Sequence, residues 1–558
     1  MNEKKTALLS VYRKEGIVEF ARGLKELGWN ILASGGTAKH LKDAGIEATD
    51  VAMLVGEPML GHRVVTLSRE VHAGLLAKDT EEDRRELAAR HVPFIDLVCV
   101  DLYPLEEEIA RPRSVRESVV EMTDIGGPAM LRAAAKGGRI VVCDPEDRVR
   151  VLEWLKKHDD PIKSAGADHG AGYDDDPFVQ ELAAKAEFVV ARYGFASALY
   201  LGEGAYAGVV GKRIAECLYG ENVWQAPAAL YQNGSGDPLA LRNFTLVEGT
   251  TLSYNNWCDM DRLLQTLTHI AAALEANPVT RDAASAASNG ERIAVAVKHG
   301  NPCGAAYGED AKKVLENVIL GDPLAIMGGV VMTNFPIGAS EAETLASFKM
   351  RGEERRLLDA VIAPAFDGAA IELLRRKKDK CRFVANGALA RVGADSLDVQ
   401  PRIRYVRGGF LRQPNYTFVV NFESLMLKRH GPRATPEIEL DLAFAWAIGS
   451  TSNSNTITIA KNGMLLGDGV GQQDRVGAAE LALRRARRSG HEPTGAVAYS
   501  DSFFPFPDAP QVLIDAGICA ILSTSGSVRD EDTIKLCEAK GVSLYLIPDK
   551  EGRGFFGH

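Results

Sequence analysis

The N-terminal third of the chain alternates short apolar runs with stretches whose apolar positions share one helical face. Thr6–Val11 is a short apolar run, and the apolar residues between positions 17 and 27 recur at helical spacing. A Gly-Trp pair at residues 28–29 breaks this helix, and Asn30–Ala33 begins the next strand. This order predicts a βαβ unit with a parallel sheet, and ligands of such sheets bind at the carboxyl ends of the strands.

The same pattern continues along the chain. It predicts strands at residues 95–100 and 140–143, with a helix at residues 128–136 between them. Much later, residues 293–297 (Ile-Ala-Val-Ala-Val) form another apolar, strand-like run. A buried strand that ends in polar residues typically delivers side chains to a binding or catalytic site.

Lys298 and His299 end this run, and Gly-Asn-Pro-Cys-Gly follows at residues 300–304. We interpret residues 300–304 as a turn. Adjacent strand residues point to opposite faces, so lysine and histidine reach one substrate only if the backbone bends here. For an arbitrary Lys-His dipeptide, the more frequent reading is a surface lysine beside a capping histidine.

Length and composition narrow the class of protein. A chain of 558 residues is too long for one core and should divide into two to four domains. Hydrophobic residues make up 46% and charged residues 25%, which is typical of a soluble globular protein. The formal net charge of −10 argues against nucleic acid as the main partner, whereas a local pocket can still bind a small anion.

The cysteines and the apolar segments indicate a cytoplasmic protein. The eight cysteines are scattered and contain no CxxC pair, which argues against a disulfide framework and a cysteine zinc site. No apolar core follows the charged N-terminal residues, and no stretch is long enough to span a bilayer. We therefore expect no membrane association and no metal centre.

Two glycine-rich turns are candidates for phosphate binding. Residues 34–37 (Ser-Gly-Gly-Thr) follow a strand and precede a helix, and residues 124–128 (Asp-Ile-Gly-Gly-Pro) precede another helix. Glycines let the backbone approach an anion closely, and a helix N-terminus adds partial positive charge. A helix-capping turn is about as probable for residues 34–37 alone, but Ser10 and Lys14 hold the corresponding place after the first strand.

Several motifs, in chain order, resemble one bifunctional purine-biosynthesis family, which combines an AICAR transformylase with an IMP cyclohydrolase. The resemblance to the cyclohydrolase half of the family lies in residues 33–38, 101–104 and 124–136. The resemblance to the transformylase half lies in residues 219–222, 252–256, 297–302, 452–455, 469–475 and 500–506. The order of the motifs matches over nearly the whole chain.

The resemblance implies an α/β fold in two parts. Residues 1–200 would form a methylglyoxal-synthase-like parallel α/β domain that carries the cyclohydrolase. Residues 201–558 would form the transformylase region of two cytidine-deaminase-like α/β subdomains. The family works as an intertwined homodimer, and its small-molecule ligands are AICAR, formyl-AICAR and IMP.

The resemblance also implies two reactions. The transformylase moves a formyl group from its co-substrate, 10-formyltetrahydrofolate, to the 5-amino group of AICAR, and the cyclohydrolase closes the product to IMP with loss of water. The AICAR amine is a poor nucleophile, so a positioned base is needed, and the oxyanion on the formyl carbon needs a donor. By this resemblance His299 transfers the proton, Lys298 stabilises charge, and Asn455 orients His299 or the formyl oxygen.

The remaining site residues are carried over motif by motif. The cyclohydrolase catalytic set comprises Tyr103, Asp124 and Lys136. The nucleotide and phosphate contacts are Ser10, Lys14, Ser34, Gly35, Gly36, Thr37, Arg63, Thr66, Tyr219, Asn256, Arg553 and His558. The folate contacts are Phe503, Pro505, Phe506 and Asp508, although a Phe-Phe-Pro-Phe run by itself is equally compatible with core packing.

Some positions depart from the family pattern. Val65 stands in place of a catalytic lysine, Leu218 in place of a phosphate-binding arginine, and Asp101 in place of an asparagine. Three hypotheses therefore stay open: a working bifunctional enzyme, a transformylase without cyclohydrolase activity, or a paralogue that binds nucleotide or folate or formylates another amine. Because Lys298, His299, Asn455 and Asp508 are all present, we favour a purine-pathway enzyme with at least the transformylase step.

Overall fold

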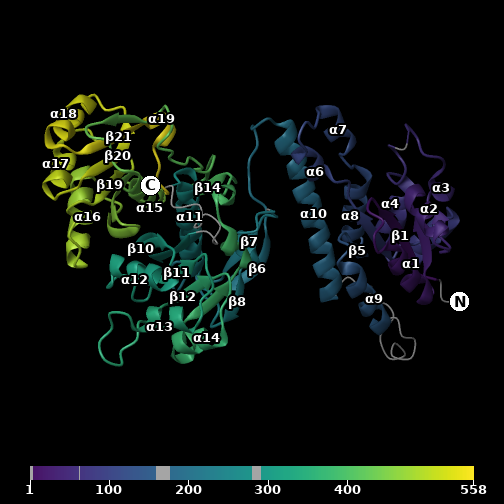
Figure 1. The fold of residues 1–558 in the computed structure, drawn as a ribbon. Helices are drawn as coiled ribbons and strands as arrows, with labels where there is room; N and C mark the ends of the chain where they lie inside the picture. The colour runs from purple at the N-terminus through teal and green to yellow at the C-terminus, as the bar shows by residue number, and fades with distance from the viewer. Residues whose placement is uncertain (1–3, 62, 159–175, 235, 279–290, 558) are drawn as a thin grey trace. The chain divides into compact units, whose positions relative to one another are not determined.

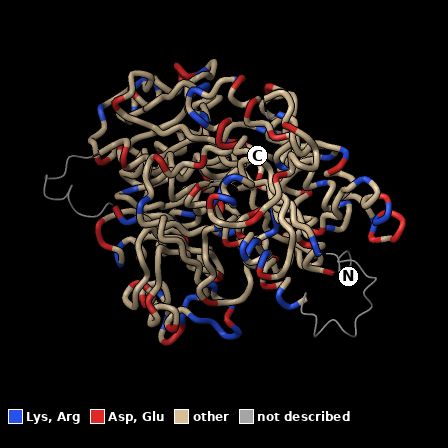
Figure 2. Tube along the Cα trace, turned by 90° about the vertical axis from the view of Figure 1, so that its right-hand side faces the viewer, with Lys and Arg blue, Asp and Glu red and all other residues tan. Residues whose placement is uncertain are grey.

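The computed structural model describes residues 4–61, 63–158, 176–234, 236–278 and 291–557. It divides into two compact units, Met1–Val210 and Gly211–His558, which we treat separately (Figure 1). Blue and red segments are interspersed along the whole trace in Figure 2, so positive charge is not gathered in one long stretch. No helix among the described residues is long and apolar enough to cross a membrane.

The first unit is built on a parallel sheet. Its strands are β1 (Thr6–Val11), β2 (Asn30–Ala33), β3 (Thr49–Asp50), β4 (Leu97–Asp101) and β5 (Ile140–Val142), in the order β3-β2-β1-β4-β5. All its neighbouring strands are parallel, which confirms the predicted parallel α/β fold. Its helices are α1 (Ile17–Glu26), α2 (Gly35–Asp43), α3 (Ala52–Val55), α4 (Arg69–Leu76), α5 (Glu81–Ala89), α6 (Leu105–Ala110), α7 (Arg116–Glu121), α8 (Gly126–Lys136), α9 (Asp147–His158) and α10 (Pro177–Leu201).

Helices cover both faces of this sheet. Leu8 and Leu9 of β1 are both fully buried but belong to different clusters, because successive strand residues point to opposite faces. Leu9 packs with residues of α1 and α9, and Leu8 with residues of α4 and α8. The strands therefore read as continuous apolar runs, as expected for a sheet buried on both faces.

The second unit contains one twelve-stranded mixed sheet, in the order β16-β21-β20-β19-β17-β18-β10-β9-β11-β12-β13-β8, and two separate two-stranded hairpins. The strands are β6 (Lys212–Cys217), β7 (Ala228–Gln232), β8 (Thr245–Glu248), β9 (Arg292–Lys298), β10 (Asn301–Gly308), β11 (Val330–Thr333), β12 (Ala360–Ala363), β13 (Arg382–Ala385), β14 (Arg402–Val406), β15 (Gly409–Gln413), β16 (Lys428–His430), β17 (Ile457–Lys461), β18 (Met464–Gly469), β19 (Val497–Ser500), β20 (Ala520–Ser525) and β21 (Ser543–Pro548). The helices are α11 (Tyr254–Ala276), α12 (Ala311–Gly321), α13 (Ala339–Ser347), α14 (Gly368–Leu374), α15 (Pro436–Gly449), α16 (Arg475–Arg488), α17 (Asp508–Asp515), α18 (Asp530–Lys540) and α19 (Asp549–Gly552).

The large sheet contains an internal structural repeat. A long helix, an antiparallel hairpin and three helix–strand units follow one another twice, first from α11 to β13 and then from α15 to β21. The two halves have equivalent strand orders, β10-β9-β11-β12-β13 and β18-β17-β19-β20-β21, and join where β10 pairs with β18. These are the two α/β subdomains implied by the resemblance, although no repeat is evident in the sequence.

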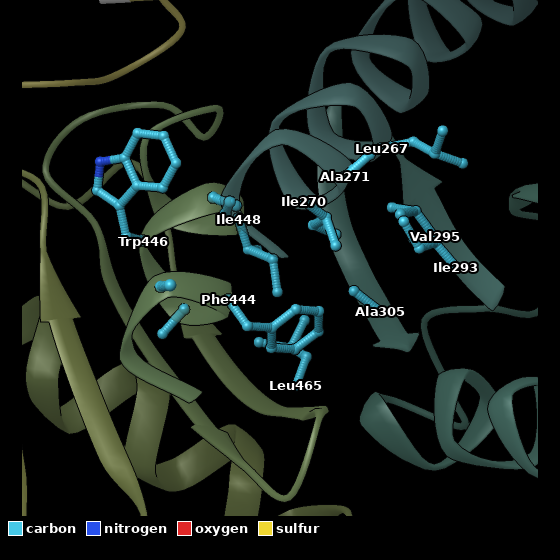
Figure 3. Close-up of a cluster of buried hydrophobic side chains, with 14 of the residues drawn as sticks. Leu267, Ile270, Ala271, Ile293, Val295, Ala305, Phe444, Trp446, Ile448 and Leu465 are labelled. Carbon is cyan, nitrogen blue, oxygen red and sulfur yellow. The ribbon is translucent and has the colours of Figure 1, made fainter. Parts of the chain in front are cut away.

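The long helices of the two halves share one core (Figure 3). Leu267 and Ile270 of α11 lie in the same cluster as Phe444 and Ile448 of α15 and Leu465 of β18. Helix α15 is apolar on almost all sides and buried along most of its length, as expected for a helix enclosed by a core. This shared core holds the two halves of the second unit together.

Candidate functional site

In the first unit, the phosphate-binding candidates meet at the carboxyl ends of β1 and β2. Ser34 is the N-cap residue of α2, so Gly35 and Gly36 form its first turn. Thr37 is fully buried, and its Oγ1 accepts hydrogen bonds from Val11 N (3.2 Å) and Lys14 Nζ (3.1 Å). Free amides of a first helical turn next to a lysine make a suitable environment for an anion.

Asp101 has a structural role at this edge. Its two carboxylate oxygens accept hydrogen bonds from Tyr12 N (2.7 Å) and Arg13 N (3.0 Å). This interaction holds the loop that follows β1 and carries Lys14. Burial lowers the pKa of Lys14, and the charge of Asp101 opposes that shift. The acidic departure from the family pattern therefore supports the cationic form of Lys14.

Tyr103 and Asp124 lie close together beside this cradle. The Tyr103 ring packs on Tyr12 with centroids 5.3 Å apart, and Asp124 Oδ1 accepts a hydrogen bond from Gly127 N (2.8 Å). Tyr193 of α10 fixes the loop, since its hydroxyl accepts from Asp124 N and donates to Met122 O. Burial raises the pKa of Asp124, and burial together with the Asp124 charge raises the pKa of Tyr103. A carboxyl with a raised pKa exchanges protons closer to neutral pH.

Two residues of the expected set, Lys136 and Arg63, lie apart from this group. Lys136 is exposed at the last turn of α8, ten residues after Gly126, so it lies roughly 15 Å from the end that follows Asp124. The assignment of Lys136 to one catalytic set with Tyr103 and Asp124 stays a prediction. Arg63 is exposed and pairs with Glu121 (3.3 Å).

Two residues that follow Arg63 closely in the chain, Val65 and Thr66, face the protein interior. Thr66 is buried, and a Cβ added at Gly126 would lie 3.0 Å from its Oγ1. Val65 is partly buried against the cluster that includes α8, so it contributes apolar packing where the family pattern has a charge. Ser10 is partly buried near the end of β1.

In the second unit, strand directions bring distant motifs to one edge of the sheet. β10 is antiparallel to β9 and to β18, β18 is antiparallel to β17, and β17 is antiparallel to β19. The end of β9, the start of β17 and the ends of β18 and β19 therefore lie at the same edge. The motifs at residues 298–301, 452–455, 469–475 and 500–503 are consequently gathered there.

The Lys298–His299 segment is a tight hairpin turn. β9 ends at Lys298, β10 begins at Asn301, and His299 (φ 54°) and Gly300 (φ 70°) are both left-handed, as in a type I′ turn. Lys298 Nζ donates to Met327 O (2.6 Å), Gly300 N donates to Asp259 Oδ1 (2.7 Å), and His299 is exposed. The backbone thus bends beside both side chains, as the candidate site requires.

The predicted turn at residues 300–304 is confirmed only at Gly300, and its extension over residues 301–304 was wrong. Residues 301–308 form β10, which contains a bulge between Pro302 and Gly304. A Cβ added at Gly304 would lie only 2.1 Å from Val318 O, so this glycine permits the close approach of α12 to the strand. Its role is packing, not a turn conformation.

Asn455 is held by the motif at residues 469–475. Its Nδ2 donates to Gln472 O (3.0 Å), and its Oδ1 accepts from Arg475 Nη1 (2.8 Å). Arg475 also bonds Asp501 Oδ1 (3.1 Å) and Phe503 O (2.8 Å). Because the amide oxygen is occupied, Asn455 has one remaining N–H donor, which suits a formyl oxygen better than an imidazole N–H.

Helix α11 connects the His299 turn to the Asn455 loop. Asp259 binds the turn, and Arg262 lies three residues later on the same helical face. Arg262 Nη2 donates to Asn453 Oδ1 (3.1 Å) and to Phe556 O (2.7 Å), and Phe556 N donates to Ser452 O. The C-terminal segment is therefore anchored beside the loop that carries Asn455.

The aromatic run divides between the core and the surface. Phe504 is buried in a hydrophobic cluster, whereas Pro505, Phe506 and Asp508 are exposed. Arg529 lies over the Phe506 ring at 5.0 Å, and Arg553 lies over the partly buried Phe503 ring at 5.5 Å. An open groove beside Phe506 is lined by Pro507, Asp508, Gln511, Asp532, Lys535 and Leu536. The folate assignment stays a prediction.

The expected nucleotide contacts of this unit have varied surroundings. Asn256 is buried, and its Oδ1 accepts from the amide and the hydroxyl of Ser253 in a capping box that begins α11. Tyr219 O accepts from Tyr254 N (3.2 Å), and Arg553 pairs with Asp549 (2.7 Å). His558 lies outside the described residues. Asn256 is therefore mainly a helix-capping residue.

The sequence reasoning missed several residues that the structure places beside the candidate groups. Asp259, Arg262, Arg475, Asp501, Tyr12 and Tyr193 were not assigned roles. Two signals in the sequence could have found some of them. Arg475 and Asp501 lie inside the motifs at residues 469–475 and 500–506. The i, i+3 spacing of Asp259 and Arg262 places both on one helical face. Across the described ranges, no group of three or more His, Cys, Asp or Glu side chains is arranged to hold a metal ion.

Comparisons with known proteins identify the family. A family model for the AICARFT/IMPCHase bienzyme matches residues 136–485, and one for the MGS-like domain matches residues 16–129. The bifunctional purine biosynthesis protein PurH of Anoxybacillus flavithermus is 34% identical over 97% of this chain and 98% of its own. That of Oceanobacillus iheyensis is 35% identical, also over 97% of this chain and 98% of its own. The match to a crystal structure of ForH covers 36% of this chain and 100% of that one at 36% identity, but its TM-score of 0.31 supports no argument about the fold. The chain belongs to the AICARFT/IMPCHase bienzyme family.

Proposed function

We propose that this chain catalyses the two reactions of its family, formyl transfer from 10-formyltetrahydrofolate to the 5-amino group of AICAR and ring closure of formyl-AICAR to IMP. Its relatives are bifunctional purine biosynthesis proteins matched over nearly their whole length, which favours both activities over the transformylase-only and paralogue hypotheses. The observation that carries the transferase assignment is the meeting of the His299 turn, the Asn455 loop and the Arg475–Asp501 pair at one sheet edge.

Formyl transfer in the second unit needs a base and an oxyanion donor. The imidazole of His299 takes a proton from the AICAR amine as its nitrogen forms a bond to the formyl carbon. The Lys298 ammonium and the remaining Nδ2 proton of Asn455 stabilise the oxyanion. The bond from the formyl carbon to N10 of the folate then breaks, N10 takes up a proton, and tetrahydrofolate leaves.

Ring closure is assigned to the first unit. The carboxamide nitrogen of formyl-AICAR attacks the formyl carbon, and the oxygen of that carbon leaves as water. We assign the proton transfers to Asp124 and Tyr103, whose raised pKa values support this role, and phosphate binding to the cradle around Lys14 and Thr37. Val65 supplies no proton, so these groups carry the step without the family's lysine.

One experiment tests both reactions. Purified protein is mixed with AICAR and 10-formyltetrahydrofolate, and formyl-AICAR is separated from IMP by chromatography. We expect IMP to form rapidly. Accumulation of formyl-AICAR without IMP would contradict the cyclohydrolase assignment, and the absence of any formylated product would contradict the transferase assignment.

Tyr103→Phe is expected to lower cyclisation of supplied formyl-AICAR by roughly 10²-fold, because it removes the hydroxyl and keeps the ring packed on Tyr12. Formyl transfer should be unchanged. Initial rates of IMP formation measure the effect. Tyr12→Phe is the matched control, since the two tyrosines are exposed to a similar degree. An equal loss in Tyr12→Phe would refute the assignment to the Tyr103 hydroxyl.

We also propose that the protein is a cytoplasmic homodimer. The isolated hairpins β6–β7 and β14–β15 expose large apolar side chains, including Tyr231, Tyr405 and Leu411, and such exposure supports burial against another subunit. Sedimentation velocity would test this, and a monomer at micromolar concentration would contradict it.

A further inference from the structure

One tyrosine hydroxyl bonds both ends of the short segment at residues 122–124. This segment joins α7 to α8 and ends in Asp124, to which we assign proton transfer in ring closure. The hydroxyl of Tyr193 in α10 accepts a hydrogen bond from Asp124 N (2.7 Å) and donates one to Met122 O (2.8 Å). The segment is therefore tied to a helix that follows much later in the chain.

The surroundings of Tyr193 give its hydroxyl a fixed role. Its side chain is buried in a small cluster with Leu105 and Val119. Burial raises the pKa of Tyr193 to about 12, so the phenol keeps its proton at neutral pH. A phenol has a single proton, and here Met122 O accepts it. Tyr193 consequently has no proton to give to a substrate, and it acts on the reaction only through the segment that it holds.

The carboxylate of Asp124 has a closely fitting seat at the start of α8. Its Oδ1 accepts a hydrogen bond from Gly127 N (2.8 Å). A Cβ added at Gly127 would lie 2.6 Å from Asp124 Oδ2 and 2.6 Å from Cδ2 of Leu102. The glycine thus leaves the space that the carboxylate occupies. Gly127 fixes the side chain of Asp124, and Tyr193 fixes its backbone.

We propose that Tyr193 is the positioning residue of Asp124 in ring closure. Without the hydroxyl, Asp124 N and Met122 O lose their shared partner, and the segment is free to move relative to the seat at Gly127. A displacement of about 1 Å can slow a reaction by up to about 10²-fold, because the reacting groups are no longer aligned. This inference rests on the proposed cyclohydrolase function.

The first test is Tyr193→Phe, which keeps the buried ring and removes only the hydroxyl. We expect kcat for cyclisation of supplied formyl-AICAR to fall about tenfold. KM should stay nearly unchanged, because the hydrogen bonds of the cradle around Lys14 and Thr37 do not involve Tyr193. Calorimetric titration with IMP should give the wild-type number of binding sites per chain, which shows that the first unit stays folded.

Tyr200→Phe is the matched control. Tyr200 lies on the same helix and packs against the same cluster, but its hydroxyl makes no hydrogen bond with any residue that the structure describes. This variant should cyclise formyl-AICAR at the wild-type rate. An unchanged kcat in Tyr193→Phe, or an equal loss in both variants, would contradict the proposal. If the number of IMP sites fell in proportion to kcat, Tyr193 would be only a structural residue and the proposal would be wrong.

A second measurement separates this proposal from the proposed function. Hydrogen–deuterium exchange, read by mass spectrometry with fragmentation that resolves single residues, reports the protection of the Asp124 amide. Exchange at this amide should be faster in Tyr193→Phe and unchanged in Tyr200→Phe. This readout needs no turnover, so a wild type that does not cyclise formyl-AICAR would contradict the function alone. Unchanged exchange in a folded Tyr193→Phe would contradict the positioning role.

Discussion

His299→Asn is expected to lower formyl transfer to AICAR by roughly 10²–10⁴-fold, the usual contribution of a positioned general base. Asparagine is the informative replacement because Asn462 occupies the equivalent left-handed position of the second hairpin, so the turn should keep its backbone. The imidazole alone is then removed. Initial rates with AICAR and 10-formyltetrahydrofolate measure the loss, and cyclisation of supplied formyl-AICAR should stay at the wild-type rate.

The matched control for this variant is His91→Asn. His91 is also an exposed histidine with positive φ (56°), but it belongs to the first unit. It should retain formyl transfer. Equal loss of transfer and cyclisation in His299→Asn would contradict the two-site arrangement, and a rate within threefold of the wild type would show that another group is the base.

Arg475→Met should have the largest effect on stability. Asp501 is fully buried and Arg475 is only 12% exposed, and the pair lies 3.1 Å apart. Removing the arginine leaves an unpaired buried carboxylate, which lowers the free energy of unfolding of the second unit by about 3–5 kcal/mol. Urea unfolding followed by tryptophan fluorescence measures this loss. Formyl transfer should also fall, because Asn455 Oδ1 and Phe503 O lose their donor.

The pH dependence of this loss has a definite sign. Burial raises the pKa of Asp501, and Arg475 opposes that shift. Without Arg475 the carboxyl is harder to ionise, so the destabilisation is greatest at neutral pH and shrinks as protonation neutralises Asp501 at acidic pH. Adding Asp501→Asn to Arg475→Met should recover part of the stability at neutral pH.

Arg85→Met provides the comparison for an exposed ion pair. Arg85 and Glu81 are 79% and 86% exposed, so breaking their pair should change the free energy of unfolding by no more than about 1 kcal/mol. If Arg475→Met were no more destabilising than Arg85→Met, the Arg475–Asp501 pair would not stabilise the fold in the way the structure indicates.

The helices and strands were predicted well where the local sequence alone determines the secondary structure. Thr6–Val11 and Asn30–Ala33 are strands with the predicted limits, and the helix after Ser34 begins where the Ser-Gly-Gly-Thr motif indicates. Strand β4 begins two residues later than expected and ends one residue later, at Asp101, whose carboxylate binds the neighbouring loop. That hydrogen bond joins residues far apart in sequence, so the hydrophobic periodicity of one segment cannot predict it.

The errors in the candidate site have a common physical origin. Gly304 reads as a turn residue, but its place is set by the close packing of α12 on β10. Phe504 belongs to the Phe-Phe-Pro-Phe run that supplies the predicted folate contacts, but it packs in the core. Lys136 shares a motif with Asp124, but it lies ten residues after Gly126, at the far end of helix α8. In each case a long-range contact or a helical rise decides what a motif alone leaves open.

The sequence by itself determined the family, the parallel sheet of the first unit and the Lys298–His299 pair, because periodicity and motif order are properties of short segments. Only the tertiary structure decided that the two halves of the second unit repeat one topology, and that Arg475 joins Asn455 to Asp501. The physical reason is that sheet register and core packing bring together residues more than a hundred positions apart, and such contacts leave no local pattern.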